Sequence, residues 1–342
     1  MRRRGFTLVE LLLALSLLSI LIVALVGLID TSLRIWGRSE SQRDLVEVSS
    51  GVLELLGRDL TAIEGGPRGD LVADWWTFDV DGDAVAGAPF ARLRLVKRPS
   101  PAELVRRFPG RTDGDLVEVT WALFPEPGGD GRGMLQRGER LIGDDQRLSI
   151  FDPAFFNQAG RPPAGALELV TGGVLWFECD FASQTSVVND GWTLGDRPDD
   201  CATAWDAWAR GRPDLARSVF NAPAAALPSP DERPILPRRV RVRLELERQD
   251  DVIRRARLRM PATLEDSRLE VDEGDRLPPA GTLVLVGEEW MEVLSLDGDR
   301  AAVKRARRGT TARPHAEGEI VHYGWVIERE VSVPLYREDW DL

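Results

Sequence analysis

Residues 6–29 read FTLVELLLALSLLSILIVALVGLI, a run in which Glu10 is the only formal charge. At about 1.5 Å of rise per residue, a helix of this length covers the roughly 30 Å of hydrocarbon in a bilayer. Residues 2–4 are all arginine, and positive charge on a short leading segment keeps that end in the cytoplasm. We therefore expect a single membrane pass over residues 6–29, with the N-terminus in the cytoplasm and the rest of the chain outside it.

The long apolar run is not typical of a cleaved secretory signal. Such a signal has an apolar region of about 7 to 15 residues, followed by a cleavage site between small residues. Here the run is longer and the glycine, Gly5, precedes it. A carboxylate such as Glu10 costs about 2.5–3.5 kcal/mol at the centre of a span, and the run holds no Lys, Arg or His to pair with it. Its partner must be the amine of a new N-terminus or another subunit.

The stretch RGFTLVE at residues 4–10 resembles the class III signal of type IV prepilins. In that family a membrane-embedded prepilin peptidase cuts after the glycine and N-methylates the phenylalanine that follows. The resemblance implies cleavage between Gly5 and Phe6, which makes residues 1–5 a leader. It also implies that Glu10 pairs with the N-terminal amine of a neighbouring subunit during filament assembly, which would supply the partner that the run itself lacks. A plain membrane anchor would have little use for Glu10.

The apolar run continues into a predicted amphipathic stalk. No proline occurs before Pro67, so one helix can extend from residue 6 to about residue 63, roughly 85 Å long. Within residues 30–64, charged side chains that include Asp59 fill the polar face, and GGPRGD at residues 65–70 ends the helix. The apolar stripe comprises Leu45, Val48, Val52, Leu55, Leu56, Leu60 and Ile63.

Beyond the stalk, short segments of alternating polarity predict a β-rich head over residues 71–260. The clearest, RVRVRLEL at residues 239–246, alternates as a half-buried antiparallel strand does, with one face of the sheet in water. The other candidate strands are residues 91–97, 116–124, 134–141 and 173–181. A long helix packed on such a sheet predicts an α+β, pilin-like fold.

A second small β module is predicted over residues 268–323. Asp297-Gly298-Asp299 is a hairpin turn signal between two of its strands. The module is inserted before the last strand and tail, residues 325–342, and we favour a structural role for it over a dedicated ligand-binding role. Its candidate strands are residues 281–286, 289–296, 300–305 and 319–323.

Within the prepilin-like family, the order of motifs is similar to the minor pseudopilin J of type II secretion systems. The points of likeness are Arg58-Asp59-Leu60, GVLWF at residues 173–177, Trp192, and LPRRVRV at residues 236–242. Two long segments, residues 182–234 and 268–323, depart from the compact family pattern.

The likeness to pseudopilin J implies a low-copy subunit near the tip of a periplasmic pseudopilus, anchored in the bacterial inner membrane with its head in the periplasm. Its implied partners are the I-type and K-type minor pseudopilins, the major pseudopilin, the prepilin peptidase and an inner-membrane platform. A cytoplasmic ATPase would supply the force for assembly.

The chain offers little catalytic chemistry. Its two histidines, His315 and His322, stand in no recognised catalytic or metal-binding motif, so we expect structural or solvated side chains, no enzyme activity, no cofactor and no metal. DVDGD at residues 79–83 lacks the glycine and glutamate that a calcium loop needs further on, and we interpret it as a polar turn. The net charge of -12 disfavours nucleic-acid binding.

Cys179 and Cys201 are the only cysteines, and the predicted topology places both outside the cytoplasm, where oxidation is allowed. A disulfide between them would stabilise the fold by roughly 3 kcal/mol. The alternative is one buried thiol on a strand and one thiol in a loop.

Two other functions remain open from the sequence. The first is a minor pilin of a type IV pilus or DNA-uptake system, which would differ in its partners and not in its chemistry. The second is a membrane-tethered binding protein, in which the module at residues 268–323 recognises a ligand.

Overall fold

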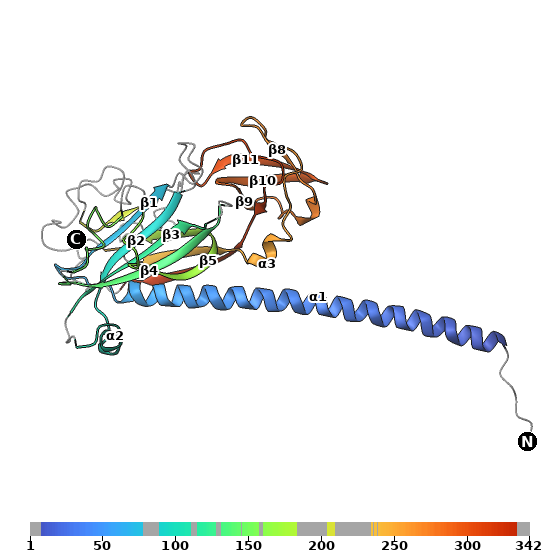
Figure 1. The fold of residues 1–342 in the computed structure, drawn as a ribbon, viewed down its shortest axis with the longest axis horizontal. Helices are drawn as coiled ribbons and strands as arrows, with labels where there is room; N and C mark the ends of the chain where they lie inside the picture. The colour runs from blue at the N-terminus through green and yellow to red at the C-terminus, as the bar shows by residue number, and fades with distance from the viewer. Residues whose placement is uncertain are drawn as a thin grey trace, which may run out of the picture. The chain divides into compact units, whose positions relative to one another are not determined.

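The structure, a computed structural model, divides into two compact units, Met1–Val48 and Ser49–Leu342. Figure 1 shows one long helix, labelled α1, and a head built from β-strands. The described residues are 8–77, 89–110, 115–127, 131–144, 146–156, 160–182, 204–208, 234, 236–237 and 239–333.

Helix α1 covers Leu8–Thr61, a length of 54 residues, in agreement with the predicted helix from residue 6 to about residue 63. The absence of proline allows this length. The helix ends at Thr61, before the glycine-rich segment predicted to end it, and Ile63 already forms an isolated β-bridge with Lys97. Across the described residues, no helix combines the length and apolar character required to cross a membrane. The membrane pass over residues 6–29 stays a prediction.

The last turns of α1 pack on the head through Val52, Leu53, Leu56 and Leu60, all of which are buried. Two assignments of the predicted stripe are wrong. Val48 is 46% exposed, although the pattern placed it on the apolar face. Asp59 was assigned to the polar face, yet it is 1% exposed, because it follows Leu56 by three residues and therefore lies on the buried face.

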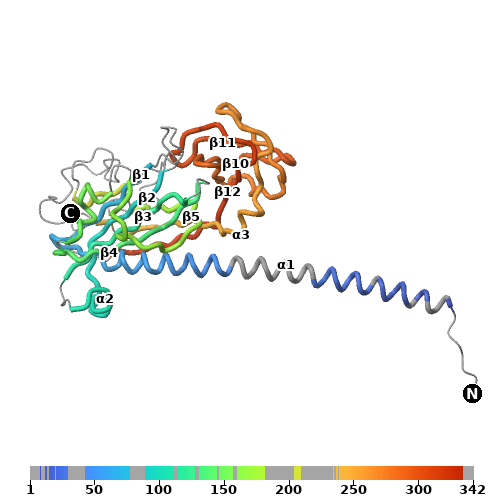
Figure 2. Tube along the Cα trace, in the orientation of Figure 1, coloured from blue at the N-terminus to red at the C-terminus, as the bar shows by residue number. Residues whose placement is uncertain are grey.

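The head contains an eight-stranded antiparallel sheet in the order β13-β7-β5-β4-β3-β2-β1-β6. The second sheet lies between β7 and β13 in the sequence, and the chain then returns to pair β13 with β7. Figure 2 shows this second sheet, labelled at β10, β11 and β12, in orange and red. The strands are β1 (Leu71–Thr77), β2 (Pro89–Lys97), β3 (Val117–Pro125), β4 (Gly133–Leu141), β5 (Glu168–Ala182), β6 (Trp205–Asp206), β7 (Arg239–Leu246) and β13 (Trp325–Ser332).

Strands β2 and β3 are buried on both faces, which corrects the prediction of a sheet with one face in water. Arg92 of β2 donates to both carboxylate oxygens of Asp74, at 2.9 and 2.8 Å. The Arg92 guanidinium also lies 4.6 Å from the centroid of the Phe156 ring. The Arg92 side chain, which in the sequence suggests a solvent-exposed face of β2, is therefore paired with Asp74 and covered by Phe156.

A short helix, α2 (Pro101–Arg107), follows β2 and was not predicted. The Ser100 side chain caps it by accepting from the backbone N–H of Glu103, and proline occupies the first turn. Serine followed by proline and then by glutamate three residues later is a helix-start signal that the sequence contains.

The second sheet has the order β12-β9-β10-β11-β8 and corresponds to the predicted module. Ala256 and Leu258 also pack in its core, so this core draws on residues before 268. Asp297 pairs with Arg300 across a two-residue turn, which is the hairpin expected there. The elements are β8 (Arg268–Glu270), β9 (Leu283–Val286), β10 (Glu289–Asp297), β11 (Arg300–Arg307) and β12 (Val321–His322), with α3 (Gln249–Val252) and a 3-10 turn at Gly274–Arg276 between β7 and β9.

Aromatic rings join the two sheets. Trp75 of β1 stacks on Trp176 of β5 with centroids 5.1 Å apart, and Trp176 meets Trp290 of β10 edge to face at 5.9 Å. Arg308 covers Trp290 at 4.0 Å and donates to Glu245 of β7 at 2.8 Å. Large buried rings and a charge pair thus fix the second sheet against the first.

Glu289 is the centre of a buried polar network inside the second sheet. It accepts from Arg305 Nε at 2.9 Å and from Arg305 Nη2 at 2.6 Å, and it lies 2.9 Å from His315 Nε2. Burial alone would raise the pKa of Glu289, but hydrogen bonds from Arg305 and His315 lower it to about 2. Burial would lower the pKa of His315, yet hydrogen bonds to Glu289 and Glu319 raise it. His315 is thus held between two carboxylates inside the second sheet.

Glu289→Gln should lower the free energy of unfolding at pH 7 by about 3–5 kcal/mol, because it leaves Arg305 and His315 without their shared counter-ion. The low folded-state pKa of Glu289 stabilises the protein above its unfolded pKa of about 4.3, and this contribution is lost as pH falls towards 2. Thermal unfolding of the full chain between pH 2 and pH 7 should therefore show a smaller acid loss in the variant.

The matched control is Glu270→Gln, since Glu270 pairs with the exposed Arg300 at 2.8 Å. An exposed pair of this kind contributes at most about 1 kcal/mol. Equal losses in the two variants would contradict a buried network centred on Glu289.

Candidate functional site

The predicted processing and assembly residues lie at the start of the chain. Gly5 and Phe6 fall outside the described residues, and Glu10 falls in the first turns of α1. Their roles in cleavage, methylation and assembly stay predictions.

At the other end of α1, a buried charge holds the helix to the head. The carboxylate of Asp59 accepts from Lys97 Nζ at 2.8 Å, from Trp121 Nε1 at 2.9 Å, and from Arg137 Nε and Nη2 at 2.8 and 2.9 Å. Together with Asp59, these three side chains form what we call the helix latch. All four are buried, so both oxygens of the carboxylate are satisfied without bulk water.

Sheet register brings the three donors together. Trp121 on β3 lies directly opposite Arg137 on β4, and Lys97 ends β2, the next strand along. The segment that follows α1 also pairs with β2, where the Glu64 N–H donates to the Val96 carbonyl at 2.9 Å. The donors of the latch therefore come from three neighbouring strands, and the end of the helix is tied to one of them.

The groups of the latch are charged at neutral pH. Burial would raise the pKa of Asp59, but hydrogen bonding and charge from Arg137 and Lys97 lower it. Burial would likewise lower the pKa of Lys97, and the pairing with Asp59 raises it instead. The pKa of Arg137 is also raised, because its interactions with Asp59 and Glu139 outweigh the effect of burial.

Asp59, Glu103 and Glu139 form a carboxylate group with the spacing of a cation site, their oxygens lying within 4.8 Å of one another among the described residues. Lys97 Nζ lies 2.8, 2.5 and 3.3 Å from these three carboxylates. The lysine ammonium thus provides the positive charge that this carboxylate group requires. Internal ion pairing accounts for the cluster.

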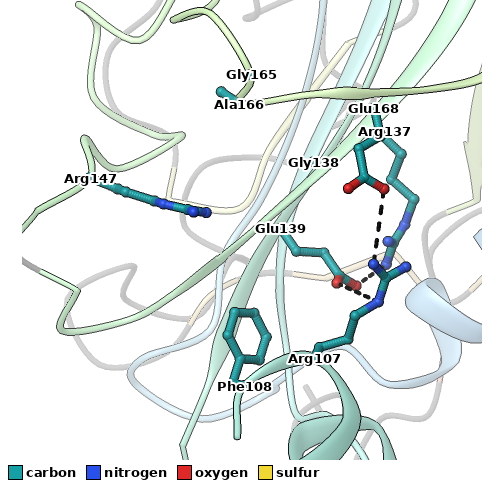
Figure 3. A pocket seen from close by; sticks show the side chains of 9 residues that line it. All are labelled: Arg107, Phe108, Arg137, Gly138, Glu139, Arg147, Gly165, Ala166 and Glu168. Atoms are coloured by element: carbon teal, nitrogen blue, oxygen red, sulfur yellow. Dashed lines mark hydrogen bonds and ion pairs between the residues drawn. The ribbon is translucent and has the colours of Figure 1, made fainter.

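A hollow of about 200 Å³ opens beside the latch (Figure 3). Arg137 and Glu139 belong both to the hollow and to the buried ion-pair cluster, and Arg137 donates to Glu139. Glu139 also lies 3.5 Å from Arg107 Nε at the end of α2. The residues lining the hollow are Arg107, Phe108, Arg137, Gly138, Glu139, Arg147, Gly165, Ala166 and Glu168.

Among the other candidates that the structure describes, Cys179 and His322 do not join this site. Cys179 is buried on β5, and burial raises the pKa of its thiol, so the thiol stays protonated and is a poor nucleophile. Cys201 and the acidic segment 79–83 lie outside the described residues, and the disulfide stays a prediction. His322 is buried on β12 with its Nδ1 2.5 Å from Glu247.

Sequence reasoning missed Lys97 and Arg137 as partners of Asp59. One signal could have found Lys97, because it is one of only two lysines in a chain with 44 basic residues. A compact ammonium can point its protons at three separate carboxylates, which a planar guanidinium does less well.

The start of the chain matches a family model described as the prokaryotic N-terminal methylation motif, over residues 1–26. No curated protein matches the chain. The motif includes Gly5, Phe6 and Glu10, and it supports a type IV prepilin-like chain. Such a start indicates membrane anchoring through the N-terminus, processing by a prepilin peptidase and assembly with other pilin-like subunits.

Replacing Asp59 should release the end of α1 from the head. Asp59→Asn removes the most deeply buried carboxylate bound by Lys97 and Arg137 and leaves these two cations only Glu103 and Glu139, so we expect a loss of about 3 kcal/mol in the free energy of unfolding. Urea unfolding of the full chain in detergent, followed by tryptophan fluorescence, measures this loss.

Glu54→Gln is the control on the same helix, since Glu54 pairs with Arg58 one turn away and both are exposed. It should cost at most about 0.5 kcal/mol. If Asp59→Asn were as mild as Glu54→Gln, the latch would not hold the helix.

Proposed function

We propose that this chain is a non-enzymatic structural subunit, a minor pseudopilin of a type II secretion pseudopilus that supports protein export across the outer membrane. The observation that carries the proposal is the N-terminal methylation motif over residues 1–26, joined to a long helix and a β-rich head. The same motif also fits a subunit of a type IV pilus. The likeness of residues 58–60, 173–177 and 236–242 to pseudopilin J favours secretion.

In this proposal the head and the helix have separate tasks. The apolar half of α1 anchors the chain in the bacterial inner membrane and then packs with the helices of neighbouring subunits, while Glu10 sets the axial register. The helix latch supports this division, because a head that must move with its helix needs a firm attachment. Asp59 supplies that attachment through donors from three strands.

The size of the head favours a position at the tip. It contains a sheet of eight strands and a second sheet of five, far more than a helix needs to cover one face. A bulky head is hard to repeat along a close-packed shaft, whereas a single copy at the tip meets no such restriction. The proposed partners are the I-type and K-type minor pseudopilins, the major pseudopilin and the inner-membrane platform, with the head in the periplasm.

Maturation should leave Phe6 as the first residue, carrying one methyl group on its amine. The intact mass and N-terminal sequence of the protein, purified from membranes of cells that contain prepilin peptidase, test this directly. A Gly5→Leu variant should keep residues 1–5, because a bulky side chain replaces the glycine that precedes the cut. A wild-type chain that begins at Met1 in such cells would overturn the filament assignment.

Glu10 should be required for assembly and not for insertion. Glu10→Ala removes the carboxylate that pairs with a neighbouring amine, so we expect loss of cross-linking to other filament subunits while the protein stays in the membrane fraction. Glu47→Gln, at an exposed position on the same helix, should assemble normally. Normal assembly of Glu10→Ala would instead favour a membrane-tethered binding protein.

A further inference from the structure

The eight-stranded sheet has one long outer edge, strand β13. This strand lies at the end of the sheet order and pairs with β7 alone. Among the described residues, no backbone hydrogen bond joins Trp325–Ser332 to any segment other than β7. Alternate residues of an antiparallel strand direct their N–H and C=O groups away from the neighbouring strand. About half of the β13 backbone is therefore available to a further strand.

The other ends of the two sheets are short. Strands β6 and β12 have two residues each, and β8 has three. Natural sheets avoid pairing with other chains through very short edge strands, or through proline, lysine or bulges on a longer edge. Strand β13 has eight residues, contains no proline or lysine, and pairs with β7 without a bulge. Within the described part of the chain, it is thus the one sheet edge long and regular enough to accept a partner.

Side chains on both faces of β13 are exposed. Trp325 and Val326 are 45% and 46% exposed, and the side chains of Glu328 and Glu330 are 43% and 46% exposed. Successive residues of a strand point to opposite faces, so these values cover both faces. Val331 alone is buried in this strand, close to Gly57 of α1. The outer edge is therefore open over most of its length.

Three consecutive charges determine which segment can pair with this edge. Glu328 and Glu330 share a face and pair on their inner side with Arg243 and Arg239 of β7, at 2.6 and 3.0 Å. A carboxylate accepts several hydrogen bonds, so each can also pair on its outer side. Arg329 lies on the opposite face, is exposed, and forms no ion pair with the described residues. Because opposite charges directly across two strands stabilise their pairing, the edge favours an acid opposite Arg329 and a base opposite each glutamate.

A second copy of β13 does not meet this requirement. In a symmetric antiparallel pair of identical strands, the side-chain faces match only where some residue lies opposite its own copy. In one of the two longest such registers, Glu328 faces Glu328. In the other, Arg329 faces Arg329 and Glu328 faces Glu330. Like charges directly opposite one another destabilise a strand pair, so the edge favours a different chain.

We propose that β13 accepts an extended segment of a partner protein as an added antiparallel strand. The segment has a basic, an acidic and a basic residue in succession, opposite Glu330, Arg329 and Glu328. Apolar residues follow, opposite Trp325 and Val326. Main-chain hydrogen bonds supply the affinity of such strand addition, and the side chains supply its selectivity. The site belongs to the head and does not depend on which filament the chain serves.

The test uses acetyl-Thr-Val-Lys-Glu-Lys-Val-Val-Tyr amide, linked to a neutral fluorophore, and the full chain in detergent. When this peptide runs antiparallel to β13, its Lys-Glu-Lys sequence lies opposite residues 330 to 328. The control peptide has Lys-Lys-Glu there, so its composition and net charge are unchanged, but lysine lies opposite Arg329 and glutamate opposite Glu328. Fluorescence anisotropy should show saturable binding that is about tenfold tighter for the Lys-Glu-Lys peptide. Bound peptide should also slow amide hydrogen exchange in residues 325–332, because their outward N–H groups become hydrogen-bonded.

Arg329→Glu should weaken binding of the Lys-Glu-Lys peptide about tenfold, because it places two acids opposite one another. The matched control is Arg268→Glu, since Arg268 is also an exposed arginine on an edge strand, the three-residue β8. Binding in this control should equal that of the wild type.

Four outcomes overturn the proposal: the Lys-Glu-Lys peptide does not bind, the Lys-Lys-Glu peptide binds as tightly, the slowed exchange falls outside residues 325–332, or the two variants bind alike. A peptide that copies residues 325–332 also overturns it if that peptide binds as tightly, because the occupant is then a second copy of the chain. Because no filament is needed, these outcomes are independent of processing at Gly5.

Discussion

The burial of one carboxylate, that of Asp59, determines how the helix and the head fit together. A lone ionised carboxylate in a protein interior costs several kcal/mol, and the cost is offset only where donors meet it with good geometry. Lys97, Trp121 and Arg137 meet it from three adjacent strands. Sliding α1 by one turn would separate Asp59 from its three donors and leave Lys97 and Arg137 with only Glu103 and Glu139 as partners. The latch thus specifies one position of the helix end on the sheet, which apolar contacts alone would define less sharply.

The second sheet depends on the same physics. Glu289, Glu247 and Glu245 are all buried, and each is met by arginine or histidine from another segment. Two of these acids, Glu245 and Glu247, belong to β7 or its end, and their partners Arg308 and His322 belong to the second sheet. Buried acids therefore join the two sheets as well as the helix. Such pairs define a unique arrangement because any alternative packing leaves a charge without its partner.

Strands could be predicted from the sequence where polar and apolar residues alternate. Functional residues could be predicted only where they belong to a recognised local motif. Residues 239–246 were expected as a strand and form β7, because a regular alternation identifies a strand without knowledge of its neighbours. Asp59 was assigned to the solvated face, since a pattern of hydrophobicity treats every charge as exposed. Its burial depends on Lys97 and Arg137, which are 38 and 78 residues away in the chain. Gly5, Phe6 and Glu10 could be named because their roles belong to a local signal.

The N-terminal motif and the head bear on different properties of the chain. The motif over residues 1–26 indicates how the chain is processed and anchored, and it says nothing of which proteins the head meets. A head fixed to its helix by a buried ion-pair cluster transmits any force on one to the other, because breaking the attachment requires exposing or stranding several charges at once. Lys97 of β2, Trp121 of β3 and Arg137 of β4 therefore concentrate the attachment of the helix in one small region of the head.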